Sequence, residues 1–232
     1  MRQIPSHDRL IFALDVASLS DARAWIDRLG DAVSHYKIGL ELLGSGDYFT
    51  VLAELKARGK RVFADLKLHD IPATVAGAAA SLARHGADLL TVHAYPDAIA
   101  AAAPKAGATK LLAITVLTSM DDAALAASGV TLSMTETVER RAVGAINAGA
   151  SGVVCSGLEA KRLRAVLGPN ALIVCPGIRS EPGGDDQQRT VTVEEAFANG
   201  ADYIVIGRPI RRAVDPKAAA QAIQTRIANL NA

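Results

Sequence analysis

The sequence predicts an α/β protein, a single (β/α)8 barrel domain that spans residues 1–232. Eight short apolar runs are separated by stretches that are each long enough for a loop, a helix and a second loop. Most of the runs are apolar at nearly every position, as is typical of parallel strands that are covered on both faces. Eight such units in 232 residues favour a closed barrel. An open doubly wound sheet of six or seven strands is the alternative.

The eight runs give the expected strands in chain order, and a helical segment is expected after each. They are residues 9–15, 33–40, 60–68, 87–94, 110–118, 151–156, 171–178 and 201–207. Residues 120–141 are expected to form a helical excursion after the fifth strand. Neither GxGxxG nor GxxxxGK[ST] follows the first strand, which weakens the case for a dinucleotide or P-loop site.

Three segments repeat one pattern, in which a helix end is followed by Gly, Ala, a small polar residue and an apolar strand. They are ARHGADLLTVH, INAGASGVVCS and FANGADYIVIG. Glycine in the left-handed conformation ends a helix and turns the chain. The repeat therefore indicates three successive helix-to-strand junctions of the same kind.

Composition excludes several classes of protein. Hydrophobic residues make up 50% of the chain and aromatic residues only 4%, so the core is large and aliphatic and the chain is not disordered. The 25 Lys and Arg residues nearly balance the 24 Asp and Glu residues, so no global field attracts nucleic acid or an acidic membrane.

The two cysteines, Cys155 and Cys175, are too few and too far apart for a disulfide framework or a CxxC metal site, and we expect both in the core. The start, MRQIPSHDRL, lacks the apolar stretch of a signal peptide. Gly, Asn and Ser interrupt the longest uncharged run, residues 142–158. A soluble cytoplasmic protein is expected.

Charged residues gather in the segment FADLKLHDIPATV, residues 63–75. With the two-residue period of a strand, Asp65, Lys67 and His69 share one face while the leucines between them point the other way. Lys37 ends the neighbouring strand, and Asp70 follows just past this one. The carboxyl ends of barrel strands hold the active site, so this array is a candidate catalytic centre. A structural salt-bridge cluster is the alternative.

A phosphate site is expected after the last two strands. IVIGRPIRR places Gly207 and Arg208 where barrels often bind phosphate through loop amides and a guanidinium. The polar, glycine-rich segment 176–189 suits a lid. An ordinary turn and a plain surface loop are the alternatives. His69 and His93 lack the spacing of metal ligands, and we expect them to be structural.

The same segments carry a family resemblance. DLKLHDIPATV contains the pattern D-x-K-x-x-D-I-P-x-T, at Asp65, Lys67, Asp70, Ile71, Pro72 and Thr74. Other matches follow in the family's order: ALD at Asp15, YKIGLEL around Lys37, VLTS at Thr118 and Ser119, PGIR at Pro176 to Arg179, DQ at Asp186 and Gln187, and IGRPI at Gly207 and Arg208. Over essentially its full length the chain resembles the orotidine 5′-phosphate decarboxylase family in its bacterial form.

The resemblance implies decarboxylation of orotidine 5′-monophosphate (OMP) to uridine 5′-monophosphate (UMP) in de novo pyrimidine biosynthesis, with no metal or organic cofactor. It also implies a homodimer with its sites at the interface, where Asp70 and Thr74 reach into the partner's site. The implied catalytic residues are Lys67, Asp65, Asp70 and Lys37. The implied substrate contacts are Asp15 and Lys37 for the ribose, Thr118, Ser119 and Pro176 for the base, and Arg179, Gln187, Gly207 and Arg208 for the phosphate.

Two other functions are compatible with parts of the pattern. A magnesium-dependent phosphosugar decarboxylase, such as one acting on keto-gulonate phosphate, shares D-x-K-x-x-D, but the HDIP continuation and VLTS argue against it. A non-catalytic phosphoribosyl-binding barrel is disfavoured by the intact Lys37, Asp65, Lys67 and Asp70.

The implied decarboxylation assigns a role to Lys67. Loss of CO2 leaves a carbanion at C6, which the ammonium of Lys67 would stabilise and protonate.

Overall fold

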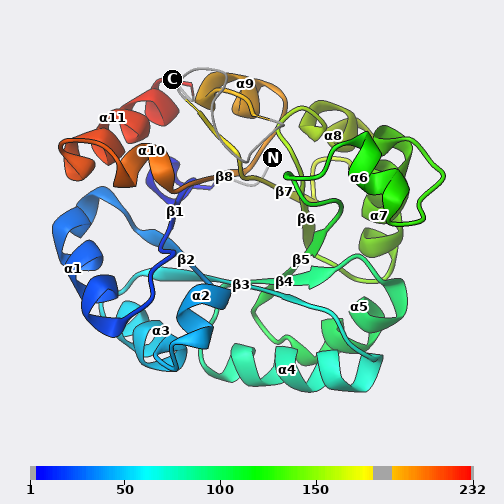
Figure 1. Cartoon of the computed structure of the whole chain (residues 1–232), viewed down its shortest axis with the longest axis horizontal. Coiled ribbons are helices and arrows are strands. Elements are labelled where there is room, and N and C mark those ends of the chain that lie inside the picture. The colour runs from blue at the N-terminus through cyan, green and yellow to red at the C-terminus, as the bar shows by residue number, and fades with distance from the viewer. Residues whose placement is uncertain (1–3, 180–189, 231–232) are drawn as a thin grey trace.

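A computed structural model describes residues 4–179 and 190–230. Eight parallel strands close into a barrel in the order β1 to β8, and helices surround the ring of strands (Figure 1). The predicted barrel is confirmed, and the open-sheet alternative is wrong because β8 pairs with β1.

Each strand lies within the range predicted for it. The strands are β1 (Leu10–Ala13), β2 (His35–Gly39), β3 (Arg61–Leu68), β4 (Leu89–His93), β5 (Lys110–Ile114), β6 (Gly152–Val154), β7 (Leu172–Cys175) and β8 (Tyr203–Ile206). All eight are shorter than predicted, because each predicted range extends beyond one or both ends of its strand.

The helices lie between the strands. They are α1 (Leu19–Leu29), α2 (Leu40–Gly44), α3 (Tyr48–Ala57), α4 (Pro72–Arg84), α5 (Pro96–Ala102), α6 (Asp122–Ala127), α7 (Met134–Asn147), α8 (Ala160–Leu167), α9 (Val193–Ala198), α10 (Arg208–Arg211) and α11 (Pro216–Asn229). Short 3-10 turns are η1 (Ser6–Asp8), η2 (Gly30–Ala32) and η3 (Ala103–Lys105). The excursion over 120–141 is helical, as predicted, and contains α6 and the first half of α7.

Side chains alternate between two cores along each strand. On β1, Leu10 and Phe12 face the helices, whereas Ile11 and Ala13 belong to a smaller cluster inside the barrel. This interior cluster is mostly aliphatic and contains two aromatic residues. Its members are Ile11, Ala13, Phe63, Leu89, Leu112, Leu172, Val174, Tyr203 and Val205. The period of two explains why the strands are apolar on both faces.

The repeated helix-to-strand junction is built as predicted. Gly86, Gly149 and Gly200 follow α4, α7 and α9 with φ of 82°, 102° and 93°, values that favour glycine. Two of the polar residues that follow them share a role, since the carboxylates of Asp88 and Asp202 each accept the amide of the second residue of the preceding strand at 2.8 Å. The Gly-Ala-Asp pattern therefore links neighbouring strands in the same way at two places at the amino-terminal end of the barrel.

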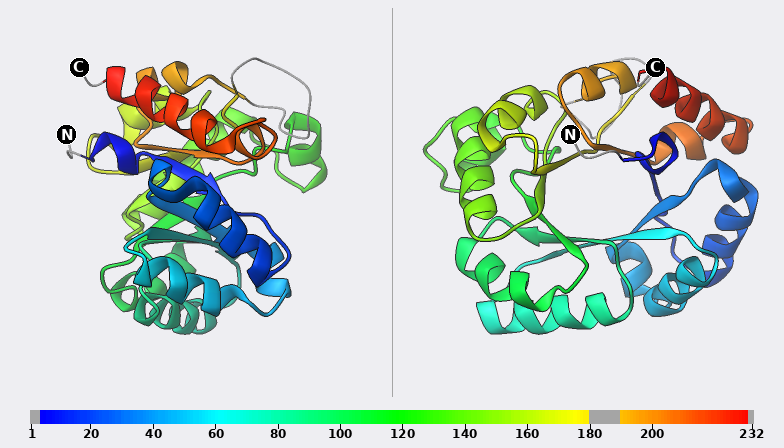
Figure 2. Two further views of the ribbon diagram at one scale, coloured as in Figure 1. Left: turned by 90° about the vertical axis from the view of Figure 1, so that its left-hand side faces the viewer. Right: turned by 180° about the vertical axis from the view of Figure 1, so that it is seen from behind.

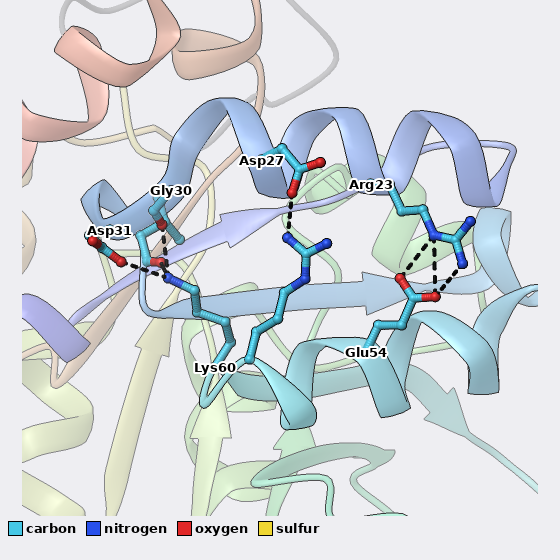
Figure 3. A network of polar contacts seen from close by, with 8 residues as sticks. Arg23, Asp27, Gly30, Asp31, Glu54 and Lys60 are labelled. Atoms are coloured by element: carbon cyan, nitrogen blue, oxygen red, sulfur yellow. Dashed lines mark hydrogen bonds and ion pairs between the residues drawn. The ribbon is translucent and has the colours of Figure 1, made fainter.

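Polar contacts link α1 to α3 on the outer surface (Figure 3). Arg23 pairs with Glu54 at 2.5 Å, and Arg58 pairs with Asp27. Lys60 instead donates to backbone oxygens where α1 ends, including that of Gly30 at 2.8 Å. Exposed ion pairs stabilise a fold only slightly, so these contacts orient the helices while apolar burial holds them on the barrel.

The barrel has two distinct ends. In the side view of Figure 2, η1 (dark blue) and the end of α11 (red) lie at one end, and α6 (green) lies at the other. The second end is where the strands finish and the polar residues of the motifs gather. Within the described residues, no helix is both long and apolar enough to cross a membrane.

His35 is buried inside the amino-terminal end of the barrel. The residue is 1% exposed, and its ring meets that of Tyr203 edge-on with 5.7 Å between the ring centroids. Neither ring nitrogen has a hydrogen-bond partner among the described residues. Burial lowers the pKa of His35 to about 4, against smaller opposing effects of Asp88 and Asp8. The native barrel therefore requires the neutral ring.

Replacing His35 with Phe is expected to remove part of the acid sensitivity of the fold. Unfolded His35 takes up a proton below about pH 6.5, whereas the folded ring does so only near pH 4, so wild-type stability falls as pH drops through this window. The loss amounts to about 3 kcal/mol. Urea unfolding at several pH values measures it, with His85→Phe, at an exposed ring, as the control. Equal pH dependence in His35→Phe and wild type would contradict the prediction.

Candidate active site

A cavity of about 330 Å³ opens at the carboxyl ends of the strands. The loops after β1, β5, β7 and β8 contribute to its wall together with β2 and β3. Its polar lining consists of Asp15, Lys37, Asp65, Lys67, Thr118, Ser119, Arg179, Arg208 and Arg211. Residues far apart in the sequence thus meet where a barrel fold places its chemistry.

Alternating charges line one side of this cavity. The Lys67 ammonium lies 2.9 Å from Oδ2 of Asp65, and the Lys37 ammonium lies 3.6 Å from the same oxygen. Lys37 also donates to Oδ1 of Asp15 at 2.7 Å. One carboxylate is therefore shared by two ammonium groups, and the second carboxylate binds the outer lysine.

Burial makes this pairing necessary. The side chains of Lys37 and Asp65 are 12% and 13% exposed. Burial alone would lower the pKa of Lys37, but Asp65 and Asp15 outweigh it and the pKa is raised. Burial alone would likewise raise the pKa of Asp65, but Lys37 and Lys67 outweigh it and the pKa is lowered. Each group is thus held in its charged form by its neighbours.

A bulge in β3 sets the position of Lys67. The register with β4 runs from Ala64 opposite Leu90 to Leu68 opposite Val92, so β3 advances two residues more than its partner. Lys67 has φ of 47° and is the one residue other than glycine with positive φ among those described. Its amide donates to Oγ1 of Thr91 at 2.8 Å. The period of two predicted the inward direction of Asp65 and Lys67, while the bulge sets how closely their charged groups approach.

The same period fails for His69. This residue follows the end of β3, and its ring stacks on Tyr95 at 4.6 Å and lies 5.0 Å from that of His93. His69 and His93 line a second cavity, and neither lines the first. Among the described residues, no group of three or more His, Cys, Asp or Glu could hold a metal ion. Cys155 and Cys175 are buried, as predicted.

Apolar side chains form the floor and one wall of the first cavity. Phe63, Ile114, Val154 and Val205 point into the barrel below the charges, and Leu117 comes from the loop after β5. Thr118 and Ser119 follow in the same loop and add hydroxyls to the rim. Pro176 lines the cavity just after β7. The site thus combines apolar walls with polar side chains that can orient a ligand, as small-molecule sites generally do.

Cationic side chains crowd the opposite side. Gly207 precedes α10 and packs so closely on β1 that an added Cβ would lie 3.1 Å from the Cβ of Ala13. Arg208 begins α10, and Arg211, one turn later, donates to the carbonyl of Asp15 at 2.5 Å. Arg179 extends from the loop after β7 into the same lining. Five cationic side chains and two carboxylates give the lining a net charge of +3, which suits an anionic ligand.

Three predicted site residues are not part of this cavity. Asp70 and Thr74 are exposed at the start of α4, outside the lining, and Oδ1 of Asp70 accepts the amide of Ile71 at 2.6 Å. Gln187 lies outside the described residues. The other predicted residues, namely Asp15, Lys37, Asp65, Lys67, Thr118, Ser119, Pro176, Arg179, Gly207 and Arg208, all line the cavity.

Sequence reasoning missed two residues around this site. Arg211 lines the cavity, and its spacing of three residues from Arg208 is the signal that could have found it. Thr91 donates to Oδ1 of Asp65 at 3.0 Å, and it is a polar residue in the otherwise apolar run LLTV of β4. Helix periodicity would have revealed the first residue, but the second depends on a contact between strands.

Known proteins resemble the chain along nearly its whole length. The model of the orotidine 5′-phosphate decarboxylase / HUMPS family matches residues 8–223. An orotidine 5′-phosphate decarboxylase of Xanthomonas euvesicatoria is 55% identical over 227 residues, covering 97% of this chain and 93% of the relative. One of Xanthomonas oryzae is 55% identical over 229 residues, with the same coverage.

Solved structures agree with this similarity. The crystal structure of orotidine 5′-phosphate decarboxylase from Lactobacillus acidophilus has a TM-score of 0.84 and 37% identity, covering 95% of this chain and 99% of that one. An uncharacterized conserved protein from Geobacillus kaustophilus has a TM-score of 0.81 and 35% identity, covering 94% and 99%.

Removing the shared carboxylate is expected to destabilise the barrel. Asp65→Asn leaves two ammonium groups close together without the negative charge between them, which should lower the free energy of unfolding by about 3–5 kcal/mol. Asp15→Asn is the matched control, because the Asp15 side chain is 44% exposed and Lys37 keeps Asp65, so a loss below about 1 kcal/mol is expected. Urea unfolding at neutral pH compares them, and equal losses would contradict the central role of Asp65.

Proposed function

Because the chain belongs to the orotidine 5′-phosphate decarboxylase / HUMPS family, we propose that the cavity described above is where it decarboxylates OMP to UMP in pyrimidine biosynthesis. The carboxylate shared between Lys37 and Lys67 at the mouth of an apolar barrel carries this proposal. By pairing with Lys67, this carboxylate holds the lysine's ammonium group in a fixed position, next to apolar walls and opposite a cluster of arginines.

The chemistry of the reaction requires such an ammonium. When the bond between C6 and the carboxylate breaks, CO2 leaves and the electron pair stays on C6 in the plane of the ring. No carbonyl of the base is placed to accept it. A fixed positive charge beside C6 stabilises the developing carbanion, and the Lys67 ammonium can then give it a proton to form UMP. Asp65 keeps that ammonium in place.

The remaining lining residues fit the rest of the substrate. We assign Asp15 and Lys37 to the ribose hydroxyls, and Thr118 and Ser119 to the pyrimidine. Pro176 is assigned to the face of the base, and Arg179, Gly207 and Arg208 to the phosphate, with Gln187 as a further contact from outside the described residues. The carboxylate and phosphate of OMP are negative, which suits the net positive lining. Phosphate contacts lie far from the bond that breaks, but their binding energy can fix the base against Lys67.

A homodimer would complete the site. Asp70 and Thr74 are exposed and do not line their own chain's cavity, and Ile71 beside them is 66% exposed. An apolar side chain between polar ones at the start of α4 suits a surface that a second copy covers. We therefore assign Asp70 to the catalytic group and Thr74 to the substrate contacts of the partner's cavity, where Asp70 would add a carboxylate near Lys67.

Other predictions from the sequence are kept as proposals. Residues 1–232 would form one catalytic domain, the protein would act in the cytoplasm, and the reaction would need no metal or organic cofactor. The last of these is supported by the charges of the cavity, since Lys67 supplies the positive charge that the carbanion requires.

Metal-stripped protein is expected to decarboxylate OMP, measured as the decay of orotidylate absorbance. Lys67→Ala should lose more than the 10²–10⁴-fold in kcat that is typical for a general acid, because it also leaves Asp65 with only the more distant Lys37. Lys161→Ala, at an exposed position on α8, is the matched control and should keep wild-type activity. No turnover by the metal-stripped wild type, or an active Lys67→Ala, would overturn the proposal.

Mixing two inactive variants tests the shared site. Asp70→Ala and Lys67→Ala homodimers should each be inactive, but a heterodimer contains one site with Lys67 from one chain and Asp70 from the other. Free exchange of equal amounts should restore about a quarter of wild-type activity, since about half the dimers are mixed and each has one native site. Native mass spectrometry shows whether the subunits have exchanged. If they have exchanged and the mixture is still inactive, Asp70 does not act across an interface.

A further inference from the structure

Thr91 is placed to control the two residues at the centre of the site without touching the cavity. It lies in the middle of β4 and is 0% exposed, and it is not among the cavity lining residues. Its hydroxyl donates to Oδ1 of Asp65 at 3.0 Å and accepts the amide of Lys67 at 2.8 Å. A hydroxyl has a single proton, so both contacts depend on one oriented group.

This hydroxyl lies where β3 departs from regular pairing. Between the pairs Ala64–Leu90 and Leu68–Val92, β3 uses three residues and β4 only Thr91. In this irregular stretch the Lys67 amide donates to the side-chain hydroxyl of Thr91. Positive φ is costly for a lysine, and such strain persists only where the surroundings hold it.

The same hydroxyl fixes the orientation of Asp65. Oδ2 of this carboxylate receives both lysines, and Oδ1 receives Thr91. With both oxygens engaged, the carboxylate cannot rotate without breaking a contact to a buried group. The position of the Lys67 ammonium is consequently fixed by two contacts: Thr91 holds the backbone of Lys67, and Asp65 binds the ammonium itself.

We infer that Thr91 is a positioning residue for the decarboxylation, holding the Lys67 backbone and the Asp65 carboxylate in the geometry that places the ammonium at C6. The inference rests on the proposed roles of Lys67 and Asp65. It assigns Thr91 no contact with substrate, so its loss reduces the rate of the chemical step and leaves the phosphate contacts intact.

Thr91→Val tests this, because valine keeps the shape of threonine and lacks the hydroxyl. A small misplacement of a reacting group lowers the rate by up to about 100-fold, so kcat should fall by about 10- to 100-fold while KM for OMP changes little. Thr91→Ser keeps the hydroxyl and should retain most of wild-type kcat. Thr109→Val is the matched control, since its buried hydroxyl donates to the Ala87 carbonyl at 2.7 Å at the other end of the barrel.

The pH profile separates positioning from a general loss of structure. Asp65 is faced by Lys37, Lys67 and Thr91, and in the proposed dimer by Asp70 of the partner subunit. The hydroxyl of Thr91 helps to lower the pKa of Asp65, after the larger effects of the two lysines. Activity that needs this carboxylate is lost as pH falls through its pKa. In Thr91→Val the acid limb of kcat should therefore move to higher pH, and in Thr91→Ser it should return.

Activities are normalised to folded protein, measured by circular dichroism and a thermal melt. If Thr91→Val does not fold, Thr91→Cys replaces it, because a thiol is a weaker hydrogen-bonding group, and its kcat should lie below that of Thr91→Ser. Wild-type kcat and an unmoved acid limb in folded Thr91→Val, or in the Cys variant, would overturn the inference. An inactive wild type or an active Lys67→Ala would instead overturn the proposed function, so the two failures are distinguishable.

Discussion

The ion pairing of Asp65 with Lys37 and Lys67 is the constraint on which the rest of the structure depends. Three charges lie inside an otherwise apolar barrel, and each would be costly there without the others. Pairing requires β2 and β3 to be neighbours in a fixed register, with Lys37 opposite Phe63. The loop after β1 must also bring Asp15 to Lys37. A closed barrel satisfies these demands and leaves the Lys67 ammonium facing a cavity.

The sequence was sufficient for the fold because its signals are local. Alternation along β1 separates Phe12 from Ile11, and Gly86, Gly149 and Gly200 mark three junctions by their backbone conformation. The inward direction of Asp65 and Lys67 follows from the same alternation. Closure of the barrel was predicted from the number of units alone, since each unit supplies one strand to the ring.

The details of the site were less predictable because they depend on contacts between strands. No residue in DLKLHD signals that Lys67 has positive φ, since glycine is absent there. His69 follows the end of β3, and its ring lies beside that of His93 and not at the charges, which period-two reasoning did not foresee. Thr91 is unremarkable in its own strand and becomes important only opposite the bulge. The roles that we propose for Asp70 and Thr74 require a second chain. They were predicted from the family resemblance, because the packing of a single chain gives no signal for them.

The bulge explains how an ordinary barrel strand can present the lysine that we propose to be catalytic. In a regular strand, residues two apart on one face are about 7 Å apart, and their side chains run parallel toward the cavity. Extra residues in β3 rotate the backbone at Lys67 and allow its ammonium to reach within 2.9 Å of Asp65. The backbone strain of this conformation is offset by the Thr91 hydroxyl and by the ion pair with Asp65, both of which are contacts within the protein itself. In the proposed reaction, charges that the protein itself holds in place need little reorganisation as the carbanion forms.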